Sequence, residues 1–443
     1  MKKLFTTLSN IWKIEDLRVR ILNTLLFLLI YRIGSFIVLP GVNPVALENH
    51  AREGLLGLLN MFAGGSFARA SIFALGVMPY ISASIVVQLL GIAVPTFQKM
   101  QKEGESGRKK LNQITRYLTV AITLLQAVGY VRTQITPDAK MLGEPLFSIT
   151  SMVILTAGTL FVMWLGEKIT DKGIGNGISL IIMVGIIAQL PGAFIAELDS
   201  RLTGSGGIIP FIVEIVALFF VVIFTILIVQ GVRKIPVQYA KKIVGNKQYG
   251  GVRQYIPLKV NAAGVMPIIF AQALMFIPMS IGQFFPGAQG PVLTALTNYT
   301  SVAYNLTFAI LIIAFTFFYT AITVNPVQMS DDMKKNGGFV PGIKPGKVTG
   351  DYIDAVISKI TLPGSVFLAI IAILPSIAIV LGVNSSFAHF YGGTSLLILV
   401  GVVLDTLQQI ESHLLMRHYD GLMKTGRLRG RTPVSTGATG PAL

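Results

Sequence analysis

The stretch MFAGGSFARASIFALGVMPYISASIVVQLL (residues 61–90) decides the fold of this chain. Its first part is half polar and glycine-rich, too short to cross a membrane, and it carries Arg69. Its second part is an apolar helix that contains small or helix-breaking residues: Gly76, Pro79, Ser82 and Ser84. Small residues let membrane helices approach closely. A short re-entrant piece that leads into such a helix is unsuited to a membrane anchor and suited to a segment that opens and closes.

The composition is that of an integral membrane protein. Apolar residues make up 53% of the 443, only 13% are charged, and the mean hydropathy is +0.69. The absence of cysteine excludes disulfides, iron–sulfur clusters and thiol chemistry. The first 20 residues lack the apolar core and cleavage site of a signal peptide, and we expect an amphipathic segment there.

Ten apolar runs are long enough to cross a hydrocarbon core of roughly 30 Å. They lie at residues 21–39, 72–94, 115–131, 147–165, 174–196, 208–229, 264–285, 304–324, 362–381 and 394–410. No segment resembles a soluble domain. The sequence therefore predicts an all-α membrane protein with ten transmembrane helices.

The basic residues are distributed very unevenly between the two sides of this arrangement. Thirty of the 36 Lys and Arg fall on one side, five on the other, and Arg32 lies within the first span. An excess of positive charge marks the cytoplasmic side. Both termini are therefore predicted to be cytoplasmic, which requires an even number of spans and agrees with ten.

An odd number of spans in each half has a topological consequence. If the two halves share a fold, five spans per half force the second half to run inverted, with a pathway at the interface between the halves. The predicted organisation is a cytoplasmic N-terminus (1–20), a first half (21–200), a second half (201–414) and a cytoplasmic tail (415–443). No sequence identity between the halves supports an inverted repeat, so the repeat is inferred only from the odd number of spans in each half.

Residues 55–69 form a segment of mixed polarity on the side with few charges, broken in its middle by Gly64 and Gly65. Segments of this length are usually re-entrant or interfacial. One interpretation is a mobile stopper folded into a cavity, since irregular backbone at membrane depth needs protein or water beside it. The other is an interfacial loop helix, and the residues alone do not decide between them.

Polar groups within the spans are few. Gln88 in the second span and Gln272 in the seventh are amides that can hydrogen-bond across a separable seam, although ordinary helix packing is the commoner explanation for such residues. Arg32, Glu214 and Asp405 are the clear intramembrane charges, and none forms a midplane relay of the kind that an ion-coupled transporter needs.

No motif indicates an enzyme, a metal or a cofactor. The four histidines lack metal-ligand spacing, and His413 and His418 are five residues apart, on different faces of a helix. The string KGIGNGIS (172–179) lacks the preceding strand and the Lys-Ser/Thr ending of a phosphate-binding loop.

Two cytoplasmic loops are long and basic: RKIPVQYAKKIVGNKQYGGVRQYIPLK (233–259), and residues 325–350 with KKNGGFVPGIKPGKVTG at their centre. Cations interleaved with aromatic residues suit phosphate-rich RNA or an acidic protein surface. The alternative is topology-setting charge with contact to anionic lipid, and the charge count alone favours this alternative. The Pro-Gly corners favour a shaped docking surface.

Taken together, these motifs resemble the SecY family, the channel-forming subunits of the Sec protein translocase. The matching strings follow the family's order along almost the whole chain: RIGSFIVLPGV (32–42), FAGGSFARASIFALGVMPYISASI (62–85), KEGESGRKK (102–110), WLGEKITDKGIGNGIS (164–179), IPLKVNAAGVMP (256–267), FFYTAITVNP (317–326), GGFVPGIKPG (337–346) and YGGTSLLI (391–398).

The resemblance implies an hourglass-shaped channel with a waist of aliphatic side chains. The ring residues that it implies are Val77, Ile81, Ile178, Ile182, Ile269 and Ile398. It implies a plug at about 55–70, with Leu59, Asn60, Phe62, Gly64, Gly65, Phe67 and Arg69. It also implies a lateral gate between the second and third spans and the seventh and eighth, where Gln88 and Gln272 lie. Uncharged bulky side chains can part around a polypeptide and resist ion leak by dewetting.

The partners implied by the resemblance are SecE-like and SecG-like small membrane subunits, the SecA motor ATPase, the ribosome, the translocating polypeptide with its signal sequence, and membrane lipid. The two basic loops (about 231–262 and 325–352) become docking sites for the ribosome and SecA, with Arg233, Lys234, Lys241, Lys242, Lys247, Arg253 and Lys344 as candidate contacts. Two residues depart from the family pattern. Lys344 replaces the usual arginine, which puts a bidentate contact in doubt, and Val77 replaces the usual isoleucine.

The sequence thus predicts a passive protein-conducting channel in the bacterial plasma membrane, driven by a partner or by the membrane potential. It passes unfolded secretory polypeptides across the membrane and releases membrane-protein helices into it. An ion-coupled small-molecule transporter and a membrane-integrated insertase or intramembrane enzyme are the alternatives. The missing midplane charges argue against the first, and the missing catalytic dyad or zinc set argues against the second.

Overall fold

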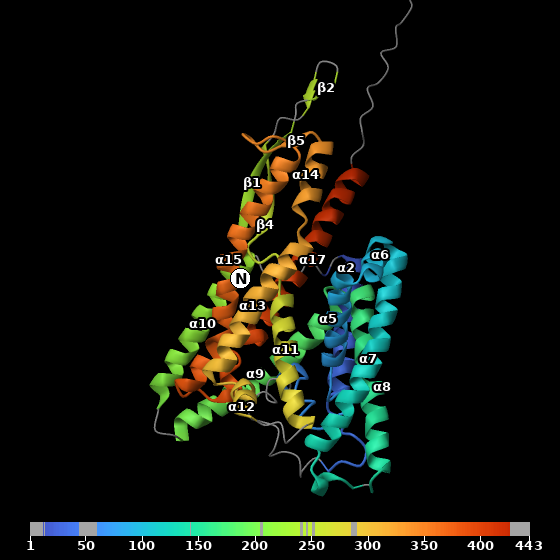
Figure 1. Cartoon of the computed structure of the whole chain (residues 1–443), viewed down its shortest axis with the longest axis vertical. Coiled ribbons are helices and arrows are strands. Elements are labelled where there is room, and N and C mark those ends of the chain that lie inside the picture. The colour runs from blue at the N-terminus through green and yellow to red at the C-terminus, as the bar shows by residue number, and fades with distance from the viewer. Residues whose placement is uncertain are drawn as a thin grey trace, which may run out of the picture.

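Ten long helices dominate the structure, a computed structural model that describes residues 12, 14–43, 60–141, 143–203, 207–239, 242–244, 247–249, 253–284 and 290–425. Each expected apolar run overlaps one long helix: α2 (Glu15–Gly34), α5 (Met78–Ala93), α7 (Glu105–Thr133), α8 (Leu146–Lys172), α9 (Gly177–Thr203), α10 (Ile208–Gln230), α11 (Met266–Phe284), α13 (Val302–Thr323), α15 (Lys347–Val380) and α17 (Gly393–Thr425). The ten-helix layout predicted from the sequence is therefore confirmed (Figure 1).

Membrane-spanning character follows from the length and composition of these helices. Within the described residues, seven helical segments are long and apolar enough to cross a bilayer, or eight if the pair at 78–93 and 95–101, bent by 103°, forms one span. The bend lies at Pro95, which begins the short helix α6 (Pro95–Lys102). Proline has no N–H to donate and cannot continue the preceding ladder of hydrogen bonds, so a bend there has a simple cause.

The second apolar run begins as irregular backbone. A continuous helix was expected from residue 72, but the chain between 63 and 77 consists of turns and α5 starts only at Met78. Gly64, Gly65 and Gly76 have φ of +63°, +86° and +54°, values that glycine alone adopts without strain. Positive φ at three positions interrupts any helix, so the re-entrant part extends further along the chain than the hydropathy indicates.

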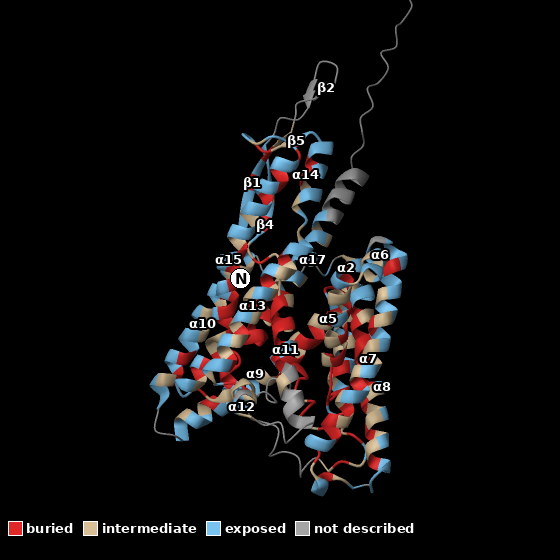
Figure 2. Ribbon diagram, in the orientation of Figure 1, coloured by how far each residue is buried: buried red, intermediate tan, exposed pale blue. Residues whose placement is uncertain are grey.

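Two groups of helices lie on either side of the molecule. The first helices (α2, α5, α7 and α8) pack together, as do α11, α13 and α15 (Figure 1). Between them, α9 contacts α2 and α8 of the first group and also α10, α16 and α17. Buried residues gather between the helices, whereas the outer face of α10 is exposed along most of its length (Figure 2). Because α10 is strongly apolar, this exposure is what a lipid-facing helix requires. The predicted half boundary at 200/201 falls inside α9, which continues to Thr203.

One end of the molecule carries a small sheet that the sequence analysis did not predict. β1 (Val232–Tyr239) pairs antiparallel with β4 (Arg253–Lys259) and with β5 (Gly338–Phe339), and a hairpin of β2 (Lys242–Val244) and β3 (Lys247–Tyr249) extends from it. α14 (Pro326–Lys335) and the start of α15 cover the sheet (Figure 1). The two loops that were predicted as separate docking segments therefore form one structure, here called the platform (β1, β4, β5, α14 and the first turns of α15).

Shorter helices complete the described chain: η1 (Pro137–Ala139), α12 (Pro291–Thr297) and α16 (Ser385–Ala388). The expected amphipathic N-terminus lies largely outside the described residues, and its last part forms the first turns of α2.

Candidate functional site

Four of the six expected ring residues, Ile81, Ile182, Ile269 and Ile398, line one small cavity. The six come from distant parts of the chain. They are contributed by the turn before α5 (Val77), by α5 (Ile81), α9 (Ile178 and Ile182), α11 (Ile269) and α17 (Ile398). All six belong to a single apolar cluster, together with Met61 and Phe62 of the expected plug. Helical spacing accounts for the pair on α9, because residues four apart lie on the same face.

The centre of this cluster is closed. A cavity of about 20 Å³ lies there, and its lining comes from both halves: Phe62, Met78, Ile81, Ile182, Ile269, Gln272, Thr394 and Ile398. A volume this small holds little more than one water molecule. The arrangement is therefore a packed apolar constriction with the plug segment seated directly against it.

The plug segment is described from Asn60 onward, and Leu59 lies outside the described residues. Phe62, Gly64 and Phe67 are buried, and Asn60, Gly65 and Arg69 are partly buried. The segment folds on itself, since the Asn60 side-chain oxygen accepts from the Ala68 N–H (2.9 Å). The interpretation as an exposed interfacial loop does not fit this burial.

A close backbone contact seats the plug against α9. The Cα of Gly185 lies so near that a Cβ at Gly64 would be 3.0 Å from it, and a Cβ at Gly185 would meet the Phe62 carbonyl oxygen at 2.9 Å. Both positions therefore need glycine for their lack of a side chain, and Gly64 also needs it for its positive φ.

Two arginines bind the backbone of the plug. Arg32 of α2 donates from Nη1 to the Gly64 carbonyl (2.8 Å), and Arg69 donates to the carbonyls of Gly64 (3.1 Å) and Gly65 (3.1 Å). Both guanidinium groups lie against the ring of Phe36, at 4.8 and 4.3 Å from its centre. Charged donors form stronger hydrogen bonds than neutral ones. In the sequence, Arg32 is only a charge within a span, and no local pattern indicates this contact.

Polar side chains of three further helices also reach the plug. Tyr130 of α7 donates to the Phe67 carbonyl (2.6 Å), Gln189 of α9 donates to the Asn60 carbonyl (2.7 Å), and the Ser395 hydroxyl at the start of α17 contacts the Met61 sulfur (3.4 Å). The Tyr130 and Phe67 rings also meet edge to face at 4.9 Å. Contacts from helices of both halves, α7 and α9 of the first and α17 of the second, thus position the plug.

The two amides expected at the lateral gate do not bond to each other. Gln88 donates to Ser84 of its own helix (3.2 Å). Gln272 is buried, lines the cavity at the constriction, and its Nε2 has no hydrogen-bond partner among the described residues. Across the expected seam, α11 contacts α7. The structure therefore closes the seam with α7 and α11 and brings Gln272 to the ring.

The expected docking residues that the structure describes lie on or beside the platform. Arg233 and Lys234 are exposed on β1, Arg253 is exposed on β4, and Lys344 is exposed between β5 and α15. Lys242 and Lys247 lie in β2 and β3, and Lys241 is outside the described residues. A core of its own supports the platform, formed by Ile235, Val237, Leu258, Met333, Val340 and Ile353. Exposed cations on a rigid base give the platform a fixed pattern of positive charge.

Within the described ranges, no group of three or more His, Cys, Asp or Glu is arranged to hold a metal ion. The site consists of an apolar constriction, a plug bonded to its surroundings and a basic platform at one end.

Known proteins share both the sequence and the fold of this chain. A family model described as SecY matches residues 71–407. The chain is 43% identical to the protein translocase subunit SecY of Streptomyces galbus over 443 aligned residues, which cover 95% of this chain and all of the relative.

Among solved structures, the chain is similar to one reported as the structure of a protein-conducting channel, with a TM-score of 0.67, 18% identity and coverage of 92% of this chain and 95% of the other. It is also similar to Sec61 in a canine ribosome-channel complex from the endoplasmic reticulum, with a TM-score of 0.63, 17% identity and coverage of 92% and 95%. At these identities, the structural likeness concerns the fold.

Proposed function

The chain belongs to the SecY family of protein translocase subunits, and from this membership we propose how it conducts polypeptides across a membrane. It is a channel subunit and not an enzyme. We propose that a translocating chain passes through the waist formed by Val77, Ile81, Ile178, Ile182, Ile269 and Ile398 after the plug has left its seat. The observation that carries the proposal is that Ile81, Ile182, Ile269 and Ile398 line one small cavity, within an apolar cluster that includes all six residues.

The chemistry of the waist suits a substrate of any sequence. Aliphatic side chains offer neither hydrogen bonds nor charges that select among polypeptides, and they can change rotamer to admit a chain. When no chain is present, their contact excludes water, and a dewetted apolar constriction opposes the passage of ions. The seated plug closes the same constriction from one side.

We propose that the plug is released together with opening of the seam between α5 and α7 on one side and α11 and α13 on the other. Gln272 links the two events, because it lies on α11 and lines the cavity next to Phe62 of the plug. A seam that opens toward lipid gives an apolar signal or anchor helix a route into the bilayer. This lateral release is the second activity that we propose.

The platform is the proposed docking surface for the ribosome and for the SecA motor. One solved relative of the same fold is described in a ribosome–channel complex. The exposed cations Arg233, Lys234, Arg253 and Lys344 suit a polyanionic partner such as ribosomal RNA. We further propose SecE-like and SecG-like subunits beside the exposed helices, and the bacterial plasma membrane as the location with both termini cytoplasmic.

A transport assay in vesicles tests the proposed function. The chain is reconstituted with SecE-like and SecG-like subunits, and a secretory polypeptide is supplied with SecA and ATP. Protection of the polypeptide from external protease is expected only when the chain is present. An absence of protection, combined with proton-coupled uptake of a small solute, would instead support the ion-coupled transporter.

A further inference from the structure

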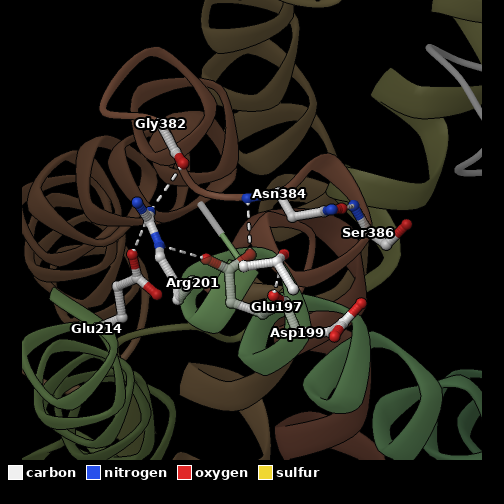
Figure 3. A network of polar contacts seen from close by, with 8 residues as sticks. Glu197, Asp199, Arg201, Glu214, Gly382, Asn384 and Ser386 are labelled. Atoms are coloured by element: carbon white, nitrogen blue, oxygen red, sulfur yellow. Dashed lines mark hydrogen bonds and ion pairs between the residues drawn. The ribbon is translucent and has the colours of Figure 1, made fainter. Parts of the chain in front are cut away.

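Three charged side chains form a cluster at the connection between the two halves (Figure 3). Arg201, in the last turn of α9, donates from Nε to Glu197 of the same helix (2.8 Å) and from Nη2 to Glu214 of α10 (2.5 Å). The same guanidinium donates to the carbonyl of Gly382 (2.8 Å), and Glu197 accepts from the backbone N–H of Asn384 (2.9 Å). One arginine therefore ties the end of α9 to α10 and to the turn between α15 and α16.

The cluster lies where the first half of the chain is connected to the second. The chain passes from its first five long helices to its last five only between Thr203, the end of α9, and Ile208, the start of α10. The segment 382–384 belongs to the second half, so its bonds to Glu197 and Arg201 join the halves beyond the covalent link. Phe194 of α9 strengthens this contact, since its ring meets Phe211 of α10 and Phe387 of α16 edge to face, at 5.3 and 6.2 Å.

The burial of these charges makes their geometry demanding. The side chains of Glu197, Glu214 and Arg201 are only 1%, 10% and 17% exposed. A single guanidinium serves two carboxylates, and among the described residues no other cation is paired with either. Buried charges are stable only with well-placed partners, and the loss of one partner is costly. A displacement of α9 relative to the turn at 382–384 would break bonds that water cannot readily replace there.

We propose that Arg201, Glu197 and Glu214 form an ionic pin that holds the two halves at their resting angle and thereby sets how readily the seam opens. These are positioning residues for gating, and they lie on the side of the molecule where the halves are connected. The proposal rests on the proposed function in one respect, because it takes the seam between α5 and α7, and α11 and α13, as the part that opens. It also assigns a role to Glu197 and Arg201, which the sequence analysis did not consider.

A distance measurement in the resting channel tests the pin. The chain has no cysteine, so spin labels can be attached at V86C on α5 and L274C on α11, both exposed positions on opposite sides of the seam. A second pair, L125C on α7 and V153C on α8, reports on the first half alone. Pulsed electron paramagnetic resonance then measures the distance between the labels of each pair, with the channel in lipid and no translocating polypeptide present.

Arg201→Met is expected to lengthen the distance across the seam, or to populate a second, longer distance, while the distance within the first half stays unchanged. The expected change in the open-to-closed ratio is more than about a hundredfold, because the loss of one partner of a buried ion pair has at least this effect when only the closed state uses the pair. Arg201→Lys keeps the charge and is expected to restore part of the wild-type distance. A purely structural role would lower the thermal stability without moving the seam.

Glu214→Gln provides a second, milder variant. It leaves Arg201 paired with Glu197, so the buried charges still balance, and it is compatible with folding even if Arg201→Met is not. A shift of the seam smaller than that of Arg201→Met supports the pin. An unchanged seam distance in every folded variant overturns it. This outcome is distinguishable from a failure of the proposed function, because the wild-type channel would still translocate a secretory polypeptide. If the wild-type channel does not translocate it, the proposed function is rejected whatever the seam distance.

Discussion

The position of Arg32 within a membrane span is explained by the backbone carbonyl to which its side chain donates. In the sequence it is an isolated cation two-thirds along the first span, for which reaching toward the membrane surface is sufficient explanation. In the structure its guanidinium instead binds the Gly64 carbonyl of the plug and lies over Phe36. Hydrophobic periodicity cannot reveal a contact between residues 32 positions apart, because nothing in the pattern specifies which carbonyl will lie within reach.

Replacement of Arg32 tests whether the plug is held by this bond. Arg32→Ala removes a charged hydrogen bond worth about 1.5–3 kcal/mol, and we expect a more frequently unseated plug and a higher ion conductance of the resting channel. Arg132→Ala is the matched control, because Arg132 is exposed and lies on the same predicted side of the membrane. Equal conductance of the two variants would show that Arg32 does not retain the plug.

Gly185 offers a steric test of the same seat. In Gly185→Ala the new Cβ would lie 2.9 Å from the Phe62 carbonyl and 3.1 Å from the Gly64 nitrogen, and we expect the plug to be displaced and the leak to rise. Gly192→Ala on the same helix meets nothing within 4 Å and is the control. Patch-clamp or vesicle ion-flux measurements distinguish the two, and a leak that rises equally in both would contradict the seating described here.

The ring residues illustrate what the sequence could predict at this scale. Their identities came from the resemblance to a family, and the structure brings all six into one cluster. The pairing of Gln88 with Gln272 was only a possibility in the sequence, and in the structure Gln88 bonds within its own helix instead. Which side chains of packed helices face each other depends on helix rotation, and the hydropathy of a nearly all-apolar helix specifies rotation poorly.

Among the elements, the plug segment was recognised from its length, polarity and glycines, and its seat could not be foreseen. The positive φ at Gly64 and Gly65 and the contact with Gly185 depend on where α9 lies. The segment is hydrogen-bonded to α2, α7 and α9. Its removal is therefore expected to change the ion conductance of the resting channel.

Deletion of residues 57–68 is expected to raise the ion leak and largely preserve secretion, because the aliphatic waist remains. The conductance of single channels in planar bilayers gives the first quantity, and protease protection of a secretory polypeptide gives the second. Unchanged conductance would mean that the segment does not close the pathway.

The platform is the element that the sequence analysis missed. The alternation in KIPVQY places Ile235 and Val237 on one face, which is typical of a strand, but the run is short and surrounded by charge. Its partners lie far away, since β1 pairs with β4 and, about 100 residues on, with Phe339 of β5. Long-range strand pairing is not encoded in local periodicity.

Charge reversal tests the docking role of the platform. Lys344→Glu is expected to weaken the binding of SecA and of ribosomes to membranes that contain the channel, without unfolding it, because Lys344 is exposed. The same is expected for reversal at Lys241 or Lys242. Arg132→Glu makes an equal charge change on the opposite predicted side and should leave both affinities unchanged. Identical affinities for all variants would remove the platform from the docking function.

For the whole molecule, the sequence predicted the number of spans and the family, and the ten helices of the structure agree. The agreement has a physical basis. A lipid environment requires long apolar helices, and the unequal number of Lys and Arg on the two sides sets the direction in which the helices cross the membrane. The relation between the halves was argued only from parity. The contacts of Arg201, on the last helix of the first half, with Glu214 and Gly382 of the second half arise from packing that no local pattern specifies.

The central claim is that a polypeptide passes through the aliphatic waist. A secretory chain is stalled during translocation, and the cysteine-free channel carries the variant I81C with a short cysteine-reactive photocrosslinker. The account predicts crosslinks from position 81 to the stalled chain and none from I209C, which is exposed on the outer face of α10. Crosslinks from position 209 but not from position 81 would contradict it.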